Sequence, residues 1–207
     1  MICFVNYILQ DWQINQDTSL KSRLVLLMFR LAQILRNLPK FLISISILYR
    51  FFYQIAVEWL LGIELPWDTQ VGPNLKLQHG QGLVINHETI IGANCILRNS
   101  TTIGNKKLQD GSYSASPKVG DNVDIGANVV IIGSITVGNN AVIGAGSVVV
   151  KDVPEGAVVA GNPARVIRTA NTTSFSSCGK EVNTLELASA SSNSTVDSLL
   201  WVFTIIS

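Results

Sequence analysis

The sequence predicts a mainly β protein whose central element is a parallel β-helix, preceded by an α-helical segment. A bulky aliphatic residue returns at every sixth position from residue 119 to residue 149. These residues are Val119, Ile125, Ile131, Val137, Ile143 and Val149. The residue two positions before each of the last five is apolar or small, and glycine follows four of the six. A period of six matches neither a helix, at about 3.6 residues per turn, nor a flat strand, at about two. It matches a coil that turns a corner every six residues, with three steps per turn and a core shared by stacked turns.

Length and charge limit what else the chain contains. Its 207 residues allow one such domain and a small flanking element. The net charge is +1 and charged residues make up 14% of the chain, without a clustered basic face. Because phosphate backbones bind clustered cations, we expect no nucleic-acid partner.

The cysteines indicate the compartment. Cys3, Cys95 and Cys178 are odd in number, widely spaced and outside any CxxC pattern. This usage is typical of a reducing compartment without structural disulfides. We therefore expect a cytoplasmic protein, and residues 1–62 show no signal-peptide cleavage pattern.

Residues 1–62 are expected to be helical. Thr18 or Ser19 is a suitable N-cap for the apolar run that starts at Leu24, and Pro39 divides the helical region in two. Charged residues interrupt the apolar run before a membrane-spanning length accumulates. Two interpretations remain for these helices. We favour packing against the solenoid end or sister subunits, because solenoids need caps, and the alternative is peripheral contact with a membrane surface.

The repeat is interrupted twice before residue 119. It runs from Val71 through Leu83 and restarts two residues later at Ile85, so residues 78–82 contain a phase break. The second interruption spans residues 105–118, which are polar and contain glycine and serine. We interpret this stretch as a loop that leaves one corner of the coil and carries function or subunit contacts.

The regular coil ends after Val149, where Pro154 and the Gly-Asn-Pro run at 161–163 follow. The predicted domains are a helical segment at 1–62, a β-helix at 63–168 and a disordered tail at 169–207. The apolar stretch at 198–207 is too short to span a bilayer.

Four motifs in the sequence resemble those of a known protein family. They are HGQGLVINHETIIGANCILRNSTTIGN, PKVGDNVDIGANVVIIG, IGAGSVVVKDVP and AGNPARVI. Together they resemble the serine acetyltransferase branch of the hexapeptide acyltransferases, most closely its colanic-acid-biosynthesis type, over about residues 58–168. The resemblance implies a left-handed parallel β-helix, assembled as a homotrimer, that transfers acetyl from acetyl-CoA to a hydroxyl group. The handedness comes from the resemblance alone, because crossovers between parallel strands are normally right-handed.

The reaction requires a base that removes a proton from the attacking alcohol. His79 lies at the phase break and matches the catalytic histidine of the family, whereas taken alone it would be a surface histidine. His87 matches no catalytic position. Glu64, fifteen residues before His79, matches the family aspartate that orients the imidazole, with a side chain one methylene longer.

Two departures from the family pattern concern the acceptor. Gln78 replaces an aspartate that helps hold the amino acid serine, and Ser116 replaces a second histidine. A neutral amide and a hydroxyl suit sugar hydroxyls better than a charged amine and carboxylate. We therefore expect a saccharide acceptor, such as an exopolysaccharide sugar. Serine O-acetylation is the alternative, and a noncatalytic trimeric scaffold is a second alternative.

For the donor, the resemblance assigns Gly104, Ala127 and Ala145 to the groove that holds the pantetheine arm. Lys151 and Arg165 are suitable cations for the phosphates of CoA. Small residues are also required at coil corners for packing alone. No metal site is expected, because a three-histidine zinc site is impossible with two histidines. Cys95 is interpreted as a buried apolar residue and not as a nucleophile.

Overall fold

A computed structural model describes residues 2–36 and 43–169, and the side chains from residue 5 onward. The helical elements are α1 (Ile2–Leu9), α2 (Leu20–Arg36), α3 (Ile43–Tyr53) and the π-helical η2 (Gln54–Leu60). The strands are β1 (Gln70–Val71), β2 (Lys76–Gln78), β3 (Val84–Ile85), β4 (Ile90–Ile91), β5 (Ile96–Arg98), β6 (Thr102–Gly104), β7 (Lys118–Val119), β8 (Asp124–Ile125), β9 (Val130–Ile132), β10 (Thr136–Val137), β11 (Val142–Ile143), β12 (Val148–Val149), β13 (Val158–Ala160) and β14 (Arg165–Arg168).

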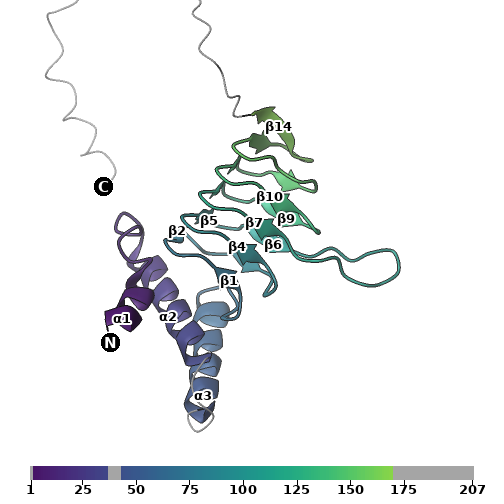
Figure 1. The fold of residues 1–207 in the computed structure, drawn as a ribbon. Coiled ribbons are helices and arrows are strands. Elements are labelled where there is room, and N and C mark those ends of the chain that lie inside the picture. The colour runs from purple at the N-terminus through teal and green to yellow at the C-terminus, as the bar shows by residue number, and fades with distance from the viewer. Residues whose placement is uncertain (1, 37–42, 170–207) are drawn as a thin grey trace, which may run out of the picture. The chain divides into compact units, whose positions relative to one another are not determined.

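The strands form a parallel β-helix with three walls, as the sequence predicts (Figure 1). The first wall is β1-β4-β7-β10, the second is β2-β5-β8-β11-β13-β14 and the third is β3-β6-β9-β12. The chain passes from the first wall to the second and then to the third in each turn. Among the wall strands that the structure describes, β14 alone pairs antiparallel to its neighbour. We call the corner between the second and third walls the second–third edge, and the corner between the third and first walls the third–first edge.

The six-residue repeat forms the core of the solenoid. Ile125 pairs in register with Ile143, and Ile131 pairs with Val149, so like positions stack in consecutive turns. These residues are buried, and so are Val123 and Val129 at the positions two before the repeat. Each turn therefore buries its apolar residues against the turns above and below it.

Asparagines form a second ladder at the corner between the first and second walls. Asn74, Asn94, Asn122 and Asn140 all have φ between 57° and 60°, a left-handed conformation that asparagine tolerates. The side-chain amide of each donates to the side-chain oxygen of the next, at 2.9 to 3.2 Å. The asparagines therefore adopt the positive φ that the corner needs, and their side-chain amides bond one another.

The two interruptions of the repeat are visible as departures from the coil. Leu77 and Ile85 are separated by eight positions, and the additional residues form the corner at His79, whose φ is 54°. Gly80 is required there, because a Cβ would lie 2.7 Å from the Leu77 side chain. The second interruption leaves the solenoid between β6 and β7, and an antiparallel bridge joins Lys107 to Tyr113 within it (Figure 1).

The segment before α2 closes the first turn of the solenoid. The carboxylate of Asp11 accepts a hydrogen bond from the backbone N–H of Leu75 at 2.9 Å. The Asn15 amide accepts from Leu77 N at 2.9 Å and donates to Leu75 O at 2.8 Å. These side chains occupy the position of a further strand, because they bond the backbone groups that a missing turn would bond. The favoured packing interpretation is confirmed for this segment.

Helix α2 begins at Leu20, directly after one of the two N-caps that the sequence predicts, and Arg30 anchors it on the solenoid. Ser19 Oγ accepts from Ser22 N at 3.2 Å, so Ser19 is the N-cap. Arg30 is fully buried, forms an ion pair with Asp11 at 2.7 Å and donates to the carbonyls of Val71 and Gly72.

Some expectations fall outside the described residues. The predicted break at Pro39 and the predicted disorder of the tail beyond residue 169 are among them. In the ranges that the structure describes, no helix combines the length and apolar character needed to cross a bilayer.

Candidate active site

His79 lies on the second–third edge, directly after β2. Its imidazole is exposed, and within the described part of the chain neither ring nitrogen has a hydrogen-bond partner. The backbone carbonyl of His79 accepts from Gln81 N at 2.5 Å, which closes the corner tightly. A shallow pocket of about 400 Å³ is lined by His79, Gln81, Gly82, Asn99 and Ser100. The imidazole is thus available to a group that approaches this edge from outside the chain.

Glu64 lies at the start of the third wall, where its backbone pairs with Val84. Its N–H donates to Leu83 O and its carbonyl accepts from Ile85 N, both at 2.8 Å. The side chain is exposed, and no hydrogen bond joins it to His79 among the residues that the structure describes. A carboxylate–imidazole pair between these residues therefore stays a prediction.

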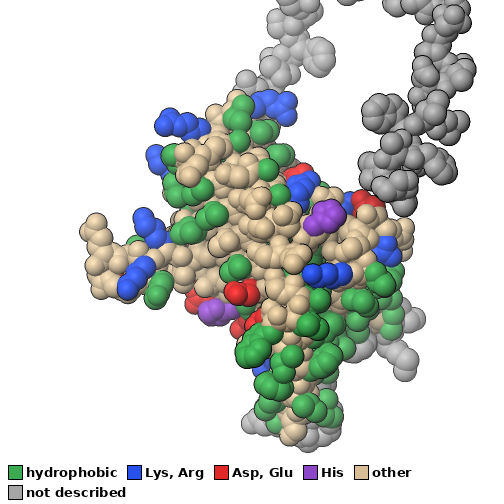
Figure 2. All heavy atoms as spheres, turned by 180° about the vertical axis from the view of Figure 1, so that it is seen from behind, with side chains coloured by type: hydrophobic (Ala, Val, Ile, Leu, Met, Phe, Trp, Pro, Cys, Tyr) green, Lys and Arg blue, Asp and Glu red, His purple; other side chains and the backbone are tan. Residues whose placement is uncertain are grey.

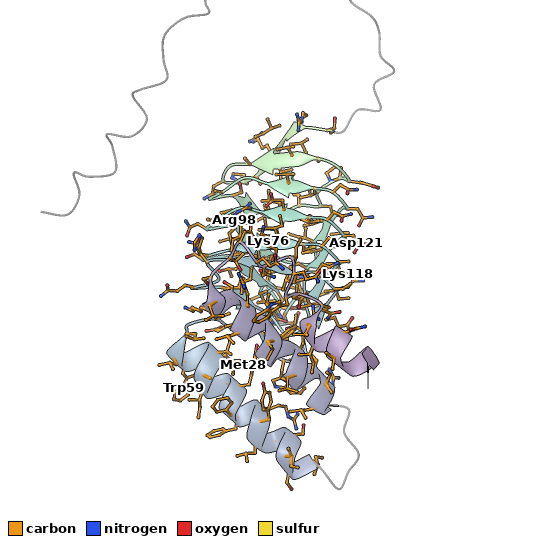
Figure 3. The ribbon with its side chains drawn as sticks, turned by 90° about the vertical axis from the view of Figure 1, so that its left-hand side faces the viewer. Met28, Trp59, Lys76, Arg98, Lys118 and Asp121 are labelled. Carbon is orange, nitrogen blue, oxygen red and sulfur yellow. The ribbon has the colours of Figure 1, made fainter. Side chains whose placement is uncertain are left out.

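Gln78 faces outward on the second wall and is held by a neighbour one turn away. Arg98 Nε donates to Gln78 Oε1 at 2.9 Å. Arg98 also forms an ion pair with Asp124 and donates to Ile125 O at 3.1 Å. Because the Gln78 oxygen is occupied by a guanidinium, its N–H₂ group is left to face outward as a donor. Figure 3 shows Arg98 and Lys76 on this wall.

Ser116 lies elsewhere, at the base of the loop on the third–first edge. Its hydroxyl is almost buried, donates to Asn86 Oδ1 at 3.0 Å and lies 3.4 Å from Glu88 Oε2. Ser116 and Gln78 therefore do not share a site within one chain.

The residues predicted to bind the acetyl donor, acetyl-CoA, are divided between the second–third edge and the third–first edge. Ala127 and Ala145 continue the second–third edge above His79, because Ser100 N donates to Gln81 O and Gly146 N donates to Ala127 O. Gly104 stacks on the third–first edge, where its carbonyl accepts from Gly133 N at 3.0 Å. Lys151 follows β12 and lies at the corner that this edge forms in a later turn.

Two of these small residues are not required by packing within the chain. A Cβ at Gly104 would meet only Asn86 Cβ, at an ordinary 3.8 Å, and Ala145 is exposed. At Gly126, by contrast, a Cβ would lie 2.5 Å from Ala145 N. The small size of Gly104 and Ala145 thus leaves room for something outside the chain to approach.

Lys151 and Arg165 line one pocket of about 550 Å³ at the last turn of the solenoid. Arg165 reaches it from β14, and neither cation has an ion-pair partner in the described part of the chain. Asp152 also lines the pocket, but its carboxylate accepts from Thr136 N at 2.8 Å. The pocket is suited to an anion such as a phosphate.

Cys95 is buried, and its Sγ contacts Gly120 O at 3.1 Å. Burial raises the pKa of this thiol, which disfavours the reactive thiolate. His79 and His87 occupy separate places on the surface (Figure 2), and the described residues contain no cluster able to hold a metal.

Sequence reasoning missed Arg98 as the partner of Gln78, and Asn86 and Glu88 as the neighbours of Ser116. The first could have been found from spacing. Gln78 and Arg98 are twenty residues apart, which is one turn of three six-residue steps plus the two residues inserted at His79. Ser116 offers no such signal, since a loop separates it from Asn86.

Comparisons with known proteins agree with this architecture. The family model "Bacterial transferase hexapeptide (six repeats)" matches residues 116–151. The putative colanic acid biosynthesis acetyltransferase WcaB of Escherichia coli K12 is 40% identical over 114 residues, covering 55% of this chain and 68% of the relative. Serine acetyltransferase 2 of Arabidopsis thaliana is 34% identical over 149 residues, covering 72% of this chain and 44% of the relative.

Solved structures with the same architecture include serine acetyltransferases. That of Neisseria gonorrhoeae superposes with a TM-score of 0.68 at 27% identity, over 83% of this chain and 69% of the other. A serine acetyltransferase in complex with CoA superposes with a TM-score of 0.64 at 25% identity, over 80% of this chain and 70% of the other.

Proposed function

We propose that this chain, which belongs to the hexapeptide-repeat acetyltransferase family, transfers the acetyl group of acetyl-CoA to a hydroxyl group of a saccharide in the cytoplasm. One observation carries the proposal. The His79 imidazole is exposed and unbonded within the described chain, at the start of the edge that continues through Ala127 and Ala145. A base and a groove lined by small residues therefore lie on one edge.

In the proposed reaction His79 is the general base. Its neutral imidazole takes the proton of the acceptor hydroxyl as the oxygen attacks the thioester carbonyl. The new C–O bond forms, the C–S bond breaks, and the imidazolium returns the proton to the sulfur of CoA. Glu64 is the proposed carboxylate that orients the imidazole and stabilises its charged form. Transfer is direct, and the buried Cys95 takes no part.

We propose that the active site is completed by a neighbouring copy in a homotrimer. The outward positions of the third wall are half-buried and mostly apolar, as at Val84, Val130 and Val148. A copy packed against this wall would bring its third–first edge beside the second–third edge of the first copy. That arrangement would unite His79 with the Gly104 and Ser116 of the adjacent chain.

The same arrangement gives acetyl-CoA a path. The pantetheine arm is proposed to lie between the two edges, against Ala127 and Ala145 of one copy and Gly104 of the next. Backbone amides at the corners would bond the amides of the arm. The phosphates would lie at the pocket formed by Lys151 and Arg165, two cations without an ion-pair partner among the residues that the structure describes.

A saccharide acceptor is supported by the orientation of Gln78. Because Arg98 occupies its oxygen, Gln78 presents N–H donors, which suit sugar oxygens and repel the ammonium group of an amino acid. Ser116 is the second proposed acceptor contact, from the neighbouring copy. Serine O-acetylation stays the second candidate, because serine acetyltransferases are among the relatives and solved structures that this chain resembles.

The test is release of free CoA thiol from acetyl-CoA with different acceptors. We expect release with nucleotide-linked or lipid-linked sugars and little with serine. Rapid release with serine alone would reverse the choice of acceptor. Failure of acetyl-CoA to bind at millimolar concentration would favour a noncatalytic scaffold, and light scattering would test the trimer.

A further inference from the structure

Helix α3 and the η2 segment turn their apolar side outward. Large exposed hydrophobic side chains occur at Ile43, Ile45, Ile47, Leu48, Phe51, Phe52, Ile55, Trp59 and Leu60. We call these residues the apolar face. Trp59 is 81% exposed and Leu60 is 80% exposed, so they contact almost nothing in the chain. Figure 2 shows the dense cover of hydrophobic side chains on the helical part, and Figure 3 shows Trp59 at its surface.

The inward side of the same helical segment carries Tyr53 and Val57, which belong to the apolar core, together with several polar groups. Tyr53 OH donates to Leu65 O at 2.7 Å, and Tyr49 OH donates to Met28 O at 3.1 Å. Ser46 is buried, and the Arg50 guanidinium lies over the Trp67 ring at 4.6 Å from its centroid. A surface helix of a globular protein normally turns its wider apolar side toward the core, whereas here the wider apolar side faces outward. The helix is therefore built to bury its outer side against something else.

The width of the apolar face helps to identify that partner. At about 100° per residue, positions 43 to 55 of the face cover roughly 200° of the helix circumference. Packing against one other helix uses a narrower stripe. A helix that lies in the interfacial region of a bilayer buries a broad apolar side rich in Trp, Phe and Leu.

The charge of the helical segment points in the same direction. Apart from Arg30, which is buried in its ion pair with Asp11, residues 20–60 contain five cations, Lys21, Arg23, Arg36, Lys40 and Arg50, and one acidic residue, Glu58. Lys21 Nζ donates to Leu61 O at 3.3 Å, so a cation lies beside the Trp59–Leu60 end of the face. Burial raises the pKa of Glu58. This excess of cations attracts anionic lipid and opposes the stacking of two like-charged copies.

From these observations we propose that the apolar face of α3 and η2 docks on the surface of an anionic lipid bilayer, without crossing it. The proposal rests on the helices alone and holds whatever the acetyl acceptor is. Docking would hold the solenoid beside the membrane, where lipid-linked acceptors are found. The electrostatic part of the binding weakens with salt, whereas the apolar part does not.

The test is flotation of the full chain with vesicles of phosphatidylcholine and phosphatidylglycerol in equal parts. We expect the unmodified chain to float with these vesicles and to float less with pure phosphatidylcholine. Replacing the two most exposed residues, Trp59→Gln with Leu60→Gln, is expected to lower vesicle partitioning about tenfold or more. The matched control is Leu108→Gln with Tyr113→Gln, which removes two exposed apolar side chains from the loop and should float like the unmodified chain.

Three results would overturn the proposal. The first is equal flotation of the Trp59/Leu60 variant and the unmodified chain, which would assign any binding to another segment such as the apolar residues 198–207. The second is an equal loss in the loop control. The third is absence of flotation together with an assembly whose size, measured by light scattering, falls in the Trp59/Leu60 variant. That third result would show that a second copy covers the face.

Discussion

Arg98 Nε donates a 2.9 Å hydrogen bond to Gln78 Oε1, and this contact determines which end of the Gln78 amide faces the candidate site. The two residues stack in consecutive turns of the second wall. Without Arg98 the amide is free to rotate, and either its oxygen or its N–H₂ group can face outward. Arg98 is therefore a positioning residue that acts through Gln78.

We expect Arg98→Met to raise the KM for the acceptor about tenfold and to leave kcat and the KM for acetyl-CoA nearly unchanged. The reason is that a charged hydrogen bond to a contact residue is lost while the base and the donor groove are intact. Initial rates of thiol release at varied acceptor and acetyl-CoA concentrations measure this. Asp124→Asn serves as the control, because Arg98 keeps its bond to Gln78. A fall in kcat at unchanged KM would contradict this role for Arg98.

His79→Ala is expected to lower acetyl transfer by about 10² to 10⁴, because the proposed general base is removed. The His79 side chain is exposed, so thermal unfolding followed by circular dichroism should be unchanged. The matched control is His87→Ala, which removes the other exposed histidine and should retain activity. Equal activity of the two variants would remove His79 from the reaction.

The solenoid could be predicted from sequence because its core obeys a local rule. The aliphatic residue at every sixth position from Val119 to Val149 is buried. The two additional residues at the phase break place His79 at a corner, where its φ is positive. The motif match then selected His79 among the two histidines. Periodicity therefore determined where the walls and corners lie.

The contacts between distant segments could not be predicted in this way. Asp11 bonds the backbone of Leu75 across 64 residues, and that contact depends on how the helices dock. The division of Gly104 and Ala145 between two edges also follows from the order of the walls, which the repeat alone does not give. The proposed site thus required the arrangement of the turns and not only their existence.

Gly104→Ala is expected to weaken acetyl-CoA binding about tenfold while leaving the unfolding midpoint unchanged. A Cβ at Gly104 has ordinary room within the chain, at 3.8 Å from Asn86 Cβ, so any effect must come from a ligand or a neighbouring copy. Calorimetric titration with CoA and urea unfolding measure the two quantities.

The comparison variant is Gly126→Ala, whose Cβ would lie 2.5 Å from a backbone nitrogen. It should lower stability, because overpacking costs about 1–3 kcal/mol. Unchanged CoA affinity in a correctly assembled Gly104→Ala variant would remove Gly104 from the donor groove.

Cys95 is expected to be inert. Burial raises the pKa of its thiol above the ordinary 9.0, so the folded chain keeps the proton to higher pH than the unfolded chain. The resulting stability is fully present below pH 9.0 and is lost as the pH rises through the folded pKa. In a chain with Cys3→Ser and Cys178→Ser, iodoacetamide should label Cys95 slowly until denaturant is added. The variant Cys95→Ala should retain acetyl transfer, and its loss would point to a covalent intermediate.

The buried ion pair between Arg30 and Asp11 holds the helical cap on the first turn. The Arg30 side chain is 0% exposed and that of Asp11 is 3% exposed. Asp11→Ala leaves the guanidinium buried without its partner and removes the acceptor for Leu75 N. We expect a loss of about 3–5 kcal/mol in the free energy of unfolding, measured by urea titration.

The matched control is Asp17→Asn, which breaks the ion pair with Lys76. Asp17 is 63% exposed, so solvent screens the pair and the urea midpoint should not shift measurably. If Asp11→Ala and Asp17→Asn shift the midpoint equally little, the side chains of the cap do not stabilise the end of the solenoid. A large shift for Asp11→Ala alone, with the circular dichroism of the folded state unchanged, is the result that this geometry requires. The reason is that the Asp11 carboxylate accepts hydrogen bonds from both the cap and the first turn, whereas the Asp17 carboxylate lies in solvent.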